Sequence, residues 1–182
     1  MRSAVFPLLL LLAACGKEAP APPPKGEAPA AAKAGAVDRS RAGSAAPDTV
    51  FENSDGEKVT LAEFRGTPVL LNLWATWCAP CVKELPTLDA LQEREGKRLQ
   101  VLTVSQDTEG RAKVEAFLGK GKYRTLEAWL DGEMGLMSAL GVTTLPTTIL
   151  YDADGREVWR VAGDKDWTGA EAADLLRETA SR

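Results

Sequence analysis

The sequence predicts a mixed α/β fold in which helices cover both faces of a central β-sheet. Two largely apolar runs, residues 69–75 and 99–105, have the composition of strands that are buried on both faces. Between them apolar residues recur at helical spacing, so the two strands and their helix form a parallel unit with a right-handed crossover. The turn sequence Asp152-Ala153-Asp154-Gly155, between two further strand-like runs, adds an antiparallel hairpin.

The amino terminus has the layout of an export signal. Arg2 precedes an apolar stretch from Ala4 to Ala14, which is too short to cross a bilayer as a helix. The stretch closes on Leu12-Ala13-Ala14-Cys15 and resembles a bacterial lipoprotein signal, in which Cys15 is lipidated and becomes the first mature residue. We therefore expect residues 1–14 to be a signal peptide. An uncleaved apolar anchor and an ordinary signal with an incidental cysteine are the alternatives.

A linker rich in Ala and Pro follows, from Cys15 to Pro47. It has almost no large apolar residue and includes Pro22-Pro23-Pro24, so it cannot bury enough surface to offset the entropy lost on ordering. We expect residues 15–47 to be a disordered, partly polyproline tether, which holds a folded domain, residues 48–182, away from a membrane.

The domain begins with an N-terminal hairpin. Thr49–Phe51 and Lys58–Thr60 are short strand-like runs on either side of the turn sequence Ser54-Asp55-Gly56. Thr60 then caps a short helical turn, residues 61–65, and the central strand follows at residues 69–75.

The rest of the chain alternates helices with strands. The expected helices run from the cysteine pair to residue 95, over residues 109–118, over residues 133–140, and onward from a cap at Thr168. The expected strands after the central one are residues 99–105, 125–130, 142–151 and 157–161.

Two cysteines, Cys78 and Cys81, directly follow the central strand and open the next helix. The first N–H groups of a helix lack intrahelical partners, and the partial positive charge there stabilises a thiolate and lowers the thiol pKa. We expect Cys78 to be this nucleophile, and Cys81, one turn further on, to be the resolving thiol that releases the product. A static structural disulfide is the alternative, although closing so small a loop stabilises a fold little.

The composition argues against several other chemistries. The chain has three cysteines and no histidine, so neither a four-ligand zinc site nor imidazole catalysis is expected. The formal net charge of −4 gives no basic surface for nucleic acid. No metal and no cofactor are expected, so the groups available for catalysis are thiols, carboxylates and the backbone.

Three separated segments carry a family resemblance: residues 72–81 (NLWATWCAPC), residues 84–86, and residues 142–148 followed by a hairpin. Together they resemble the thioredoxin fold and, within it, the membrane-anchored TlpA/ResA-type thiol-disulfide oxidoreductases. The resemblance covers about Asp48 to Arg182. It implies that residues 107–131 are a central helix-strand insertion and that the first hairpin is an N-terminal addition.

The resemblance also implies how substrate binds. In this family the proline matching Pro146 is cis and lies beside the cysteine pair, so the backbone of Leu145 is exposed and pairs with an extended substrate peptide. A trans proline at the start of a strand is the alternative. Trp77, directly before Cys78, is expected to line the rim of the site, where its ring packs on a peptide, whereas Trp74 is expected in the core.

Glu84 is the expected acid-base residue. Cytoplasmic thioredoxins place a buried aspartate at the position matching Asn72, and an asparagine cannot titrate. The resemblance implies that Glu84 replaces that aspartate, since it lies one turn beyond Cys81 on the same helix face. A solvated helix glutamate is the alternative.

The expected function is extracytoplasmic dithiol-disulfide exchange with exported, cysteine-containing client proteins, with a membrane electron donor for re-reduction. The resemblance suggests apocytochrome c or a metal-site assembly protein as the client. The cytochrome c biogenesis subgroup usually has a glutamate directly after the cis proline, where this sequence has Thr147 and Thr148. An adaptor lipoprotein with the thioredoxin fold and no turnover is the alternative.

Overall fold

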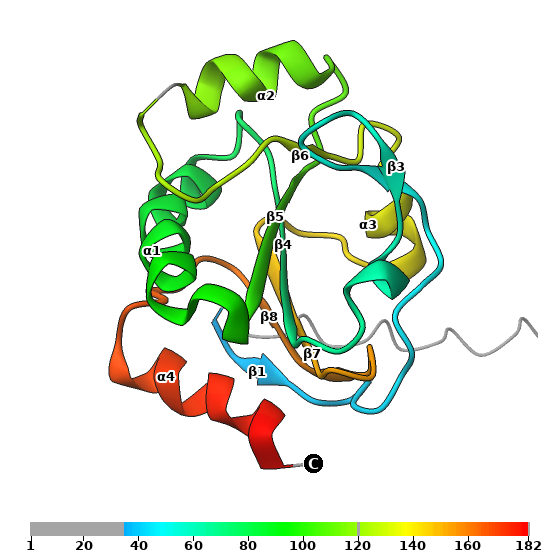
Figure 1. The fold of residues 1–182 in the computed structure, drawn as a ribbon, viewed down its shortest axis with the longest axis vertical. Helices are drawn as coiled ribbons and strands as arrows, with labels where there is room; N and C mark the ends of the chain where they lie inside the picture. Colours follow the sequence, from blue (N-terminus) through cyan, green and yellow to red (C-terminus); the bar gives the residue numbers. More distant parts are fainter. Residues whose placement is uncertain (1–34, 120, 182) are drawn as a thin grey trace, which may run out of the picture. The chain divides into compact units, whose positions relative to one another are not determined.

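The computed structural model describes residues 35–119 and 121–181, which form a mixed β-sheet flanked by helices (Figure 1). The strands follow one another across the sheet in the order β1-β8-β7-β4-β5-β6-β2-β3. Their bounds are β1 Val37–Asp38, β2 Phe51–Glu52, β3 Lys58–Val59, β4 Val69–Trp74, β5 Gln100–Ser105, β6 Trp129–Leu130, β7 Thr147–Tyr151 and β8 Glu157–Ala162. The α-helices are α1 Ala79–Glu95, α2 Arg111–Leu118, α3 Gly135–Leu140 and α4 Ala170–Leu176, and the short 3-10 helices are η1 Leu61–Phe64, η2 Gly96–Arg98 and η3 Arg177–Ser181. The predicted fold class is confirmed.

β4 is the central strand of the sheet and carries the cysteine pair beyond its end. All six of its residues are buried, as its apolar sequence predicts. It pairs in parallel with β5, from Val69 opposite Gln100 to Trp74 opposite Ser105, and antiparallel with β7 on its other side. The parallel β4-α1-β5 unit is therefore confirmed, and it places the start of α1 at the carboxyl end of β4.

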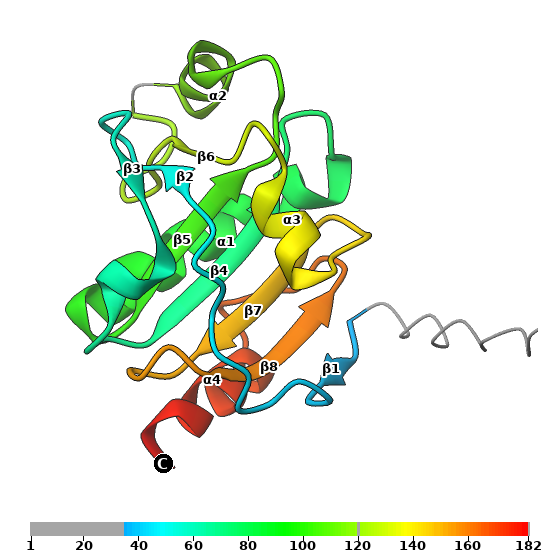
Figure 2. The ribbon, with the colours of Figure 1, turned by 90° about the vertical axis from the view of Figure 1, so that its right-hand side faces the viewer.

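Each face of the sheet has its own apolar core. On one face, α1, α2 and α4 pack through residues such as Leu85, Leu88 and Leu91, all fully buried. On the other face, α3 and η1 pack through Leu136 and Leu61. Figure 2 shows α3 in front of the sheet and α1 and α4 behind it. Burial of each α1 leucine contributes about 2 kcal/mol, so these side chains fix the helix that bears Cys81.

The folded unit begins earlier than Asp48, the boundary that the sequence predicts. β1 pairs antiparallel with Val161 and Arg160 of β8, and Ala45 forms an isolated bridge with Arg156. Residues 35–47 thereby cover the edge of β8, whose N–H and C=O groups would otherwise be unpaired. The prediction of a tether is wrong for this segment because backbone pairing does not require large apolar side chains.

Side chains also attach the segment 35–47 to the domain. Arg41 donates a hydrogen bond of 2.5 Å to the carbonyl of Leu140, at the end of α3, and Arg39 forms an ion pair of 2.5 Å with Glu178. The predicted signal, Cys15 and the rest of the predicted tether lie outside the described residues. Among residues 35–119 and 121–181, no helix combines the length and the apolarity needed to cross a bilayer.

Most of the other predicted elements are confirmed with shorter bounds. The first hairpin pairs Phe51 with Val59, and the Glu63 carboxylate accepts a hydrogen bond of 2.8 Å from the N–H of Thr60 at the start of η1. The last helix begins at Ala170 instead of directly after Thr168. The Thr168 hydroxyl bonds to Asp166 at 2.5 Å, and Gly169 is the residue that precedes the helix.

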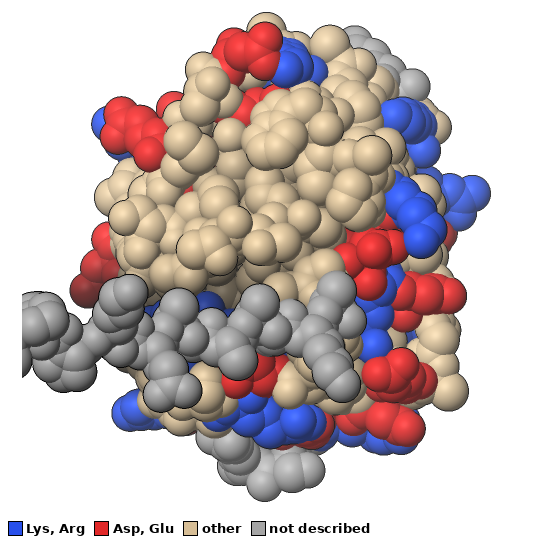
Figure 3. Space-filling view, turned by 180° about the vertical axis from the view of Figure 1, so that it is seen from behind, with Lys and Arg blue, Asp and Glu red and all other residues tan. Residues whose placement is uncertain are grey.

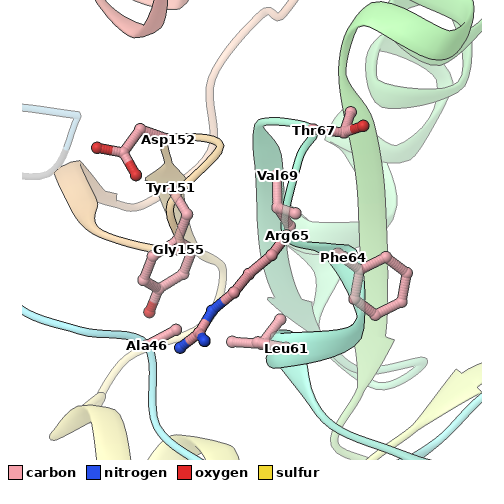
Figure 4. A pocket seen from close by; sticks show the side chains of 9 residues that line it. All are labelled: Ala46, Leu61, Phe64, Arg65, Thr67, Val69, Tyr151, Asp152 and Gly155. Atoms are coloured by element: carbon pink, nitrogen blue, oxygen red, sulfur yellow. The ribbon is translucent and has the colours of Figure 1, made fainter. Parts of the chain in front are cut away.

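A small cavity lies at the end of the sheet opposite the cysteine pair (Figure 4). Figure 4 shows the Arg65 side chain extending past the ring of Tyr151 toward Ala46 and Leu61. Burial raises the pKa of Tyr151, so its hydroxyl stays protonated. Because Val69, at the start of β4, lines this cavity and the cysteines follow the other end of that strand, the cavity is separate from the cysteine site.

Candidate active site

Cys78 and Cys81 form a disulfide at the junction of β4 and α1, with sulfurs 2.04 Å apart and Cα atoms 5.3 Å apart. Residues 75–78 form the intervening turn, which is closed by a hydrogen bond of 3.1 Å from the N–H of Cys78 to the carbonyl of Ala75. Cys78 has an extended backbone and precedes the first helical residue, while Pro80 lies in the first turn, where the N–H that proline lacks has no intrahelical partner. The predicted position of the pair, directly after the central strand and at the start of the next helix, is therefore confirmed.

The two sulfur-bearing residues differ in exposure and surroundings. Cys78 is 7% exposed, whereas Cys81 is fully buried. The N–H of Cys81 donates to the Cys78 sulfur at 3.3 Å, so this sulfur lies on the first-turn N–H groups of a 17-residue helix. That turn contains no acidic side chain. The helix terminus therefore favours a thiolate on Cys78 once the disulfide is reduced.

A cleft lies beside the disulfide. The Leu145-Pro146 peptide bond is cis, as the family resemblance implies. Leu145, Trp77 and Cys78 line the cleft together with Met134 and Met137 of the α3 region. Within residues 35–119 and 121–181, no group forms a hydrogen bond with the backbone N–H or carbonyl of Leu145. Leu145, which lines the cleft together with Cys78, therefore has both of its backbone groups unpaired in this part of the chain.

The two tryptophans near the cysteines occupy the positions that the sequence predicts. Trp74 is fully buried and donates its indole N–H to the carbonyl of Thr103 at 3.1 Å. Trp77 is 65% exposed and lines the cleft. Its ring is therefore available to a molecule that approaches Cys78.

Glu84 lies on α1 three residues beyond Cys81 and is only 2% exposed, so the alternative of a solvated glutamate is wrong. Its Oε1 accepts a hydrogen bond of 2.6 Å from the Asn72 amide. Its Oε2 accepts from the backbone N–H of Lys165 at 3.1 Å and from the indole N–H of Trp167 at 3.3 Å. Three elements, β4, α1 and the segment before α4, thus converge on one carboxyl group.

Burial raises the pKa of Glu84 to about 7, although the three hydrogen bonds to the carboxylate lower it. The Asn72 amide also donates to the Thr148 hydroxyl at 2.9 Å, while its Oδ1 has no partner in the described part of the chain. A half-turn of this amide presents Oδ1 to a protonated Glu84. Asn72 can therefore pair with both protonation states of Glu84 without titrating itself.

Sequence reasoning missed two residues of this region, Trp167 and Asp107. Trp167 is fully buried and stacks on Trp159, with ring centroids 6.1 Å apart. It lies 83 residues from Glu84, and no local pattern connects the two. Asp107 is fully buried and bonds to Thr76, two residues before Cys78. An acidic residue just beyond the end of a buried strand is the signal that could have pointed to it.

The face around the cysteine pair carries few charges. Figure 3 views the molecule from behind Figure 1, on the side where α1 begins, and shows a broad area without charged side chains. Trp77 and Met134, both in the cleft, are 65% and 43% exposed. Exposed large apolar side chains on an uncharged face are typical of a surface that contacts other proteins.

Comparison with known proteins assigns the family. Residues 41–176 match the protein-family model described as Redoxin. The chain belongs to the Redoxin family. Among curated relatives of this Redoxin, the thiol-disulfide oxidoreductase ResA of Bacillus thuringiensis subsp. konkukian is 32% identical over 124 residues, or 68% of this chain and 70% of the relative. ResA of Bacillus subtilis is 35% identical over 122 residues, or 66% and 67%. This Redoxin is therefore a thiol-disulfide oxidoreductase.

Solved structures confirm the thioredoxin fold of this Redoxin. The pneumococcal exposed lipoprotein thioredoxin Etrx1 of Streptococcus pneumoniae superposes with a TM-score of 0.62 at 26% identity, covering 72% of this chain and 99% of that one. StoA of Bacillus subtilis superposes with a TM-score of 0.57 at 26% identity, covering 74% and 98%.

Proposed function

We propose that this protein is an extracytoplasmic reductase of disulfides in exported client proteins, in which Cys78 is the nucleophile and Cys81 the resolving thiol. One observation carries the proposal: Cys78 lines the cleft and its sulfur accepts a hydrogen bond from the first turn of α1, while its disulfide partner Cys81 is fully buried. A client disulfide can reach only the first of these sulfurs.

The proposed reaction has two steps. The Cys78 thiolate attacks one sulfur of the client disulfide, forms a mixed disulfide and releases the other client sulfur as a thiolate. Cys81, having lost its proton, then attacks the Cys78 sulfur, which re-forms the Cys78–Cys81 disulfide and releases the second client thiolate. Two electrons pass from the enzyme to the client, and a membrane electron donor restores the dithiol.

Glu84 is the proposed acceptor of the Cys81 proton. Both side chains are buried, and Glu84 lies three residues further along the same helix. Because burial raises its pKa to about 7, Glu84 can take up and give back a proton near neutral pH. The amide of Asn72 bonds to Glu84 in either state.

The client peptide is proposed to bind across the cleft as an extended strand. The free backbone groups of Leu145 offer one donor and one acceptor beside Cys78, and the cis Pro146 directly follows them. The exposed ring of Trp77, which lines the same cleft, supplies apolar contact.

The protein is proposed to be lipid-anchored through Cys15, on the periplasmic side of a bacterial membrane. The support is the export-like sequence of residues 1–15 and the similarity to a protein described as an exposed lipoprotein thioredoxin. Replacement of Cys15 by Ala should release the protein from the membrane fraction. Persistent membrane association would favour an apolar anchor instead.

Client identity is tested by trapping. Full-length protein with Cys81→Ser cannot resolve the mixed disulfide, so exported clients should accumulate as conjugates that separate on reduction. The matched variant Cys78→Ser should trap none. Apocytochrome c and metal-site assembly proteins are the proposed clients. The cytochrome c subgroup usually has a glutamate where this sequence has Thr147, so the sequence favours the metal-site assembly proteins.

Reduction of insulin by dithiothreitol separates turnover from an adaptor role. The wild-type protein should accelerate insulin precipitation, and Cys78→Ser should not. If the protein is an adaptor, insulin should precipitate at the uncatalysed rate with the wild-type protein and with Cys78→Ser.

A further inference from the structure

Asp107 is a buried carboxylate that has no role in the proposed two-step reaction. It lies two residues beyond the end of β5. Its Oδ2 accepts hydrogen bonds from the N–H of Thr76 and from the Ser105 hydroxyl, both at 2.8 Å. Its Oδ1 accepts from the Thr76 hydroxyl at 2.7 Å and lies 3.3 Å from the Lys113 ammonium. Burial by itself raises the pKa of Asp107, but these hydrogen bonds outweigh it and hold the pKa below its ordinary value.

The two bonds to Thr76 extend the pairing of β4 and β5 into the turn that bears Cys78. The last paired residues of these strands are Trp74 and Ser105, and the N–H of Gln106 then bonds to the carbonyl of Trp74 at 2.8 Å. Asp107 follows, and its carboxylate takes both donors of Thr76, a central residue of the turn 75–78. The turn is thus fixed to the sheet two residues before the nucleophile.

Reduction of the disulfide removes the covalent link that joins Cys78 to Cys81. The position of the Cys78 sulfur then depends on the turn that precedes it. We propose that Asp107 is a positioning residue, which fixes Thr76 and so keeps the Cys78 sulfur at the first-turn N–H groups of α1 in the reduced enzyme. Lys113 of α2 pairs with this carboxylate and also with Glu109, so the Asp107 carboxylate is held from α2 as well as from the turn.

The chain contains a matched control for this arrangement. On α1, Asp89 accepts hydrogen bonds from the N–H of Thr125 at 2.8 Å and from the Thr125 hydroxyl at 2.6 Å. Asp89 lies eight residues beyond Cys81, which is roughly 12 Å along the helix axis. Thr125→Val therefore removes the same kind of bond as Thr76→Val at a distance from the sulfurs.

The test measures how fast Cys78 reacts in the reduced full-length protein at pH 7. Iodoacetamide is added, and alkylation of Cys78 is followed by tandem mass spectrometry of the tryptic peptide 66–83, whose fragments distinguish Cys78 from Cys81. Thr76→Val should slow alkylation about three- to tenfold, the range that corresponds to one lost hydrogen bond. Thr76→Ser, which keeps the hydroxyl, should react within about twofold of wild type, and so should Thr125→Val.

Thermal unfolding of the same variants distinguishes an effect on the position of the Cys78 sulfur from an effect on the stability of the protein. Thr76→Val and Thr125→Val should lower Tm to a similar extent, yet only the first should slow alkylation. Equal alkylation rates for these two variants, or a Thr76→Ser variant as slow as Thr76→Val, would overturn the proposal. Asp107→Asn should slow alkylation at least as much as Thr76→Val; should it fail to fold, the Thr76 variants decide the question.

Discussion

The substitution Glu84→Gln tests the raised pKa of Glu84 through protein stability. Because burial raises this pKa from 4.5 to about 7, the folded protein binds the proton more tightly than the unfolded chain does. Between these two pH values the folded state holds more protons, so its free energy of unfolding falls as pH rises. The difference of about 2.5 between the two pKa values corresponds to about 3 kcal/mol, and the loss is complete above pH 7.

The glutamine variant removes this dependence and keeps the volume of the side chain. Its amide can donate to the Oδ1 of Asn72, which has no partner in the described part of the chain. Urea unfolding of the oxidised proteins, in which Cys78 and Cys81 cannot titrate, should be measured at pH 4 and pH 8.5. Wild type should lose about 3 kcal/mol more than Glu84→Gln between these conditions. Parallel pH profiles for the two proteins would refute the reasoning.

Three further predictions concern other parts of the molecule. A chain that starts at residue 48 lacks β1 and its hydrogen bonds, each of which contributes about 1 kcal/mol. Its free energy of unfolding in urea should therefore be about 2–5 kcal/mol lower than that of a chain that starts at residue 35. Equal free energies would contradict the role of β1. Trp167→Phe removes one hydrogen-bond donor to the Glu84 carboxylate, so the pKa of Glu84 should rise in a carbon NMR titration. Trp159→Phe, which changes the neighbouring ring, should leave the pKa of Glu84 unchanged. Trp77→Ala should change stability by less than about 0.5 kcal/mol yet raise the KM for a peptide disulfide severalfold, since the ring is exposed in the cleft. An unchanged KM would remove Trp77 from the binding surface.

The sequence predicts those elements whose burial leaves a periodic or continuous apolar pattern. β4 and β5 are buried almost throughout, and the leucines of α1 recur at helical spacing, so both strands and their helix were predictable. The cysteine pair was predictable for a local reason, because four adjacent residues determine both its geometry and its position at the helix terminus.

Features that depend on distant or backbone contacts leave little trace in the sequence. β1 is a two-residue edge strand, and main-chain hydrogen bonds to β8 hold it in place. The compositional signs of this segment are weak: no proline occurs between Pro29 and Pro47, and residues 37–41 (VDRSR) differ from the Ala, Pro, Gly, Lys and Glu of residues 16–36. Trp167 reaches Glu84 across 83 residues. The burial of Glu84, and with it the raised pKa, follows from this packing and from no pattern within α1.

The pH dependence of Cys78 alkylation in the reduced protein tests the central claim most directly. Because the sulfur lies on the N-terminus of α1, the alkylation rate should rise with a midpoint clearly below the ordinary thiol value of about 8.5. A midpoint at that ordinary value, or a Cys78 that reacts only after unfolding, would contradict the assignment of this sulfur as the enzyme's nucleophile.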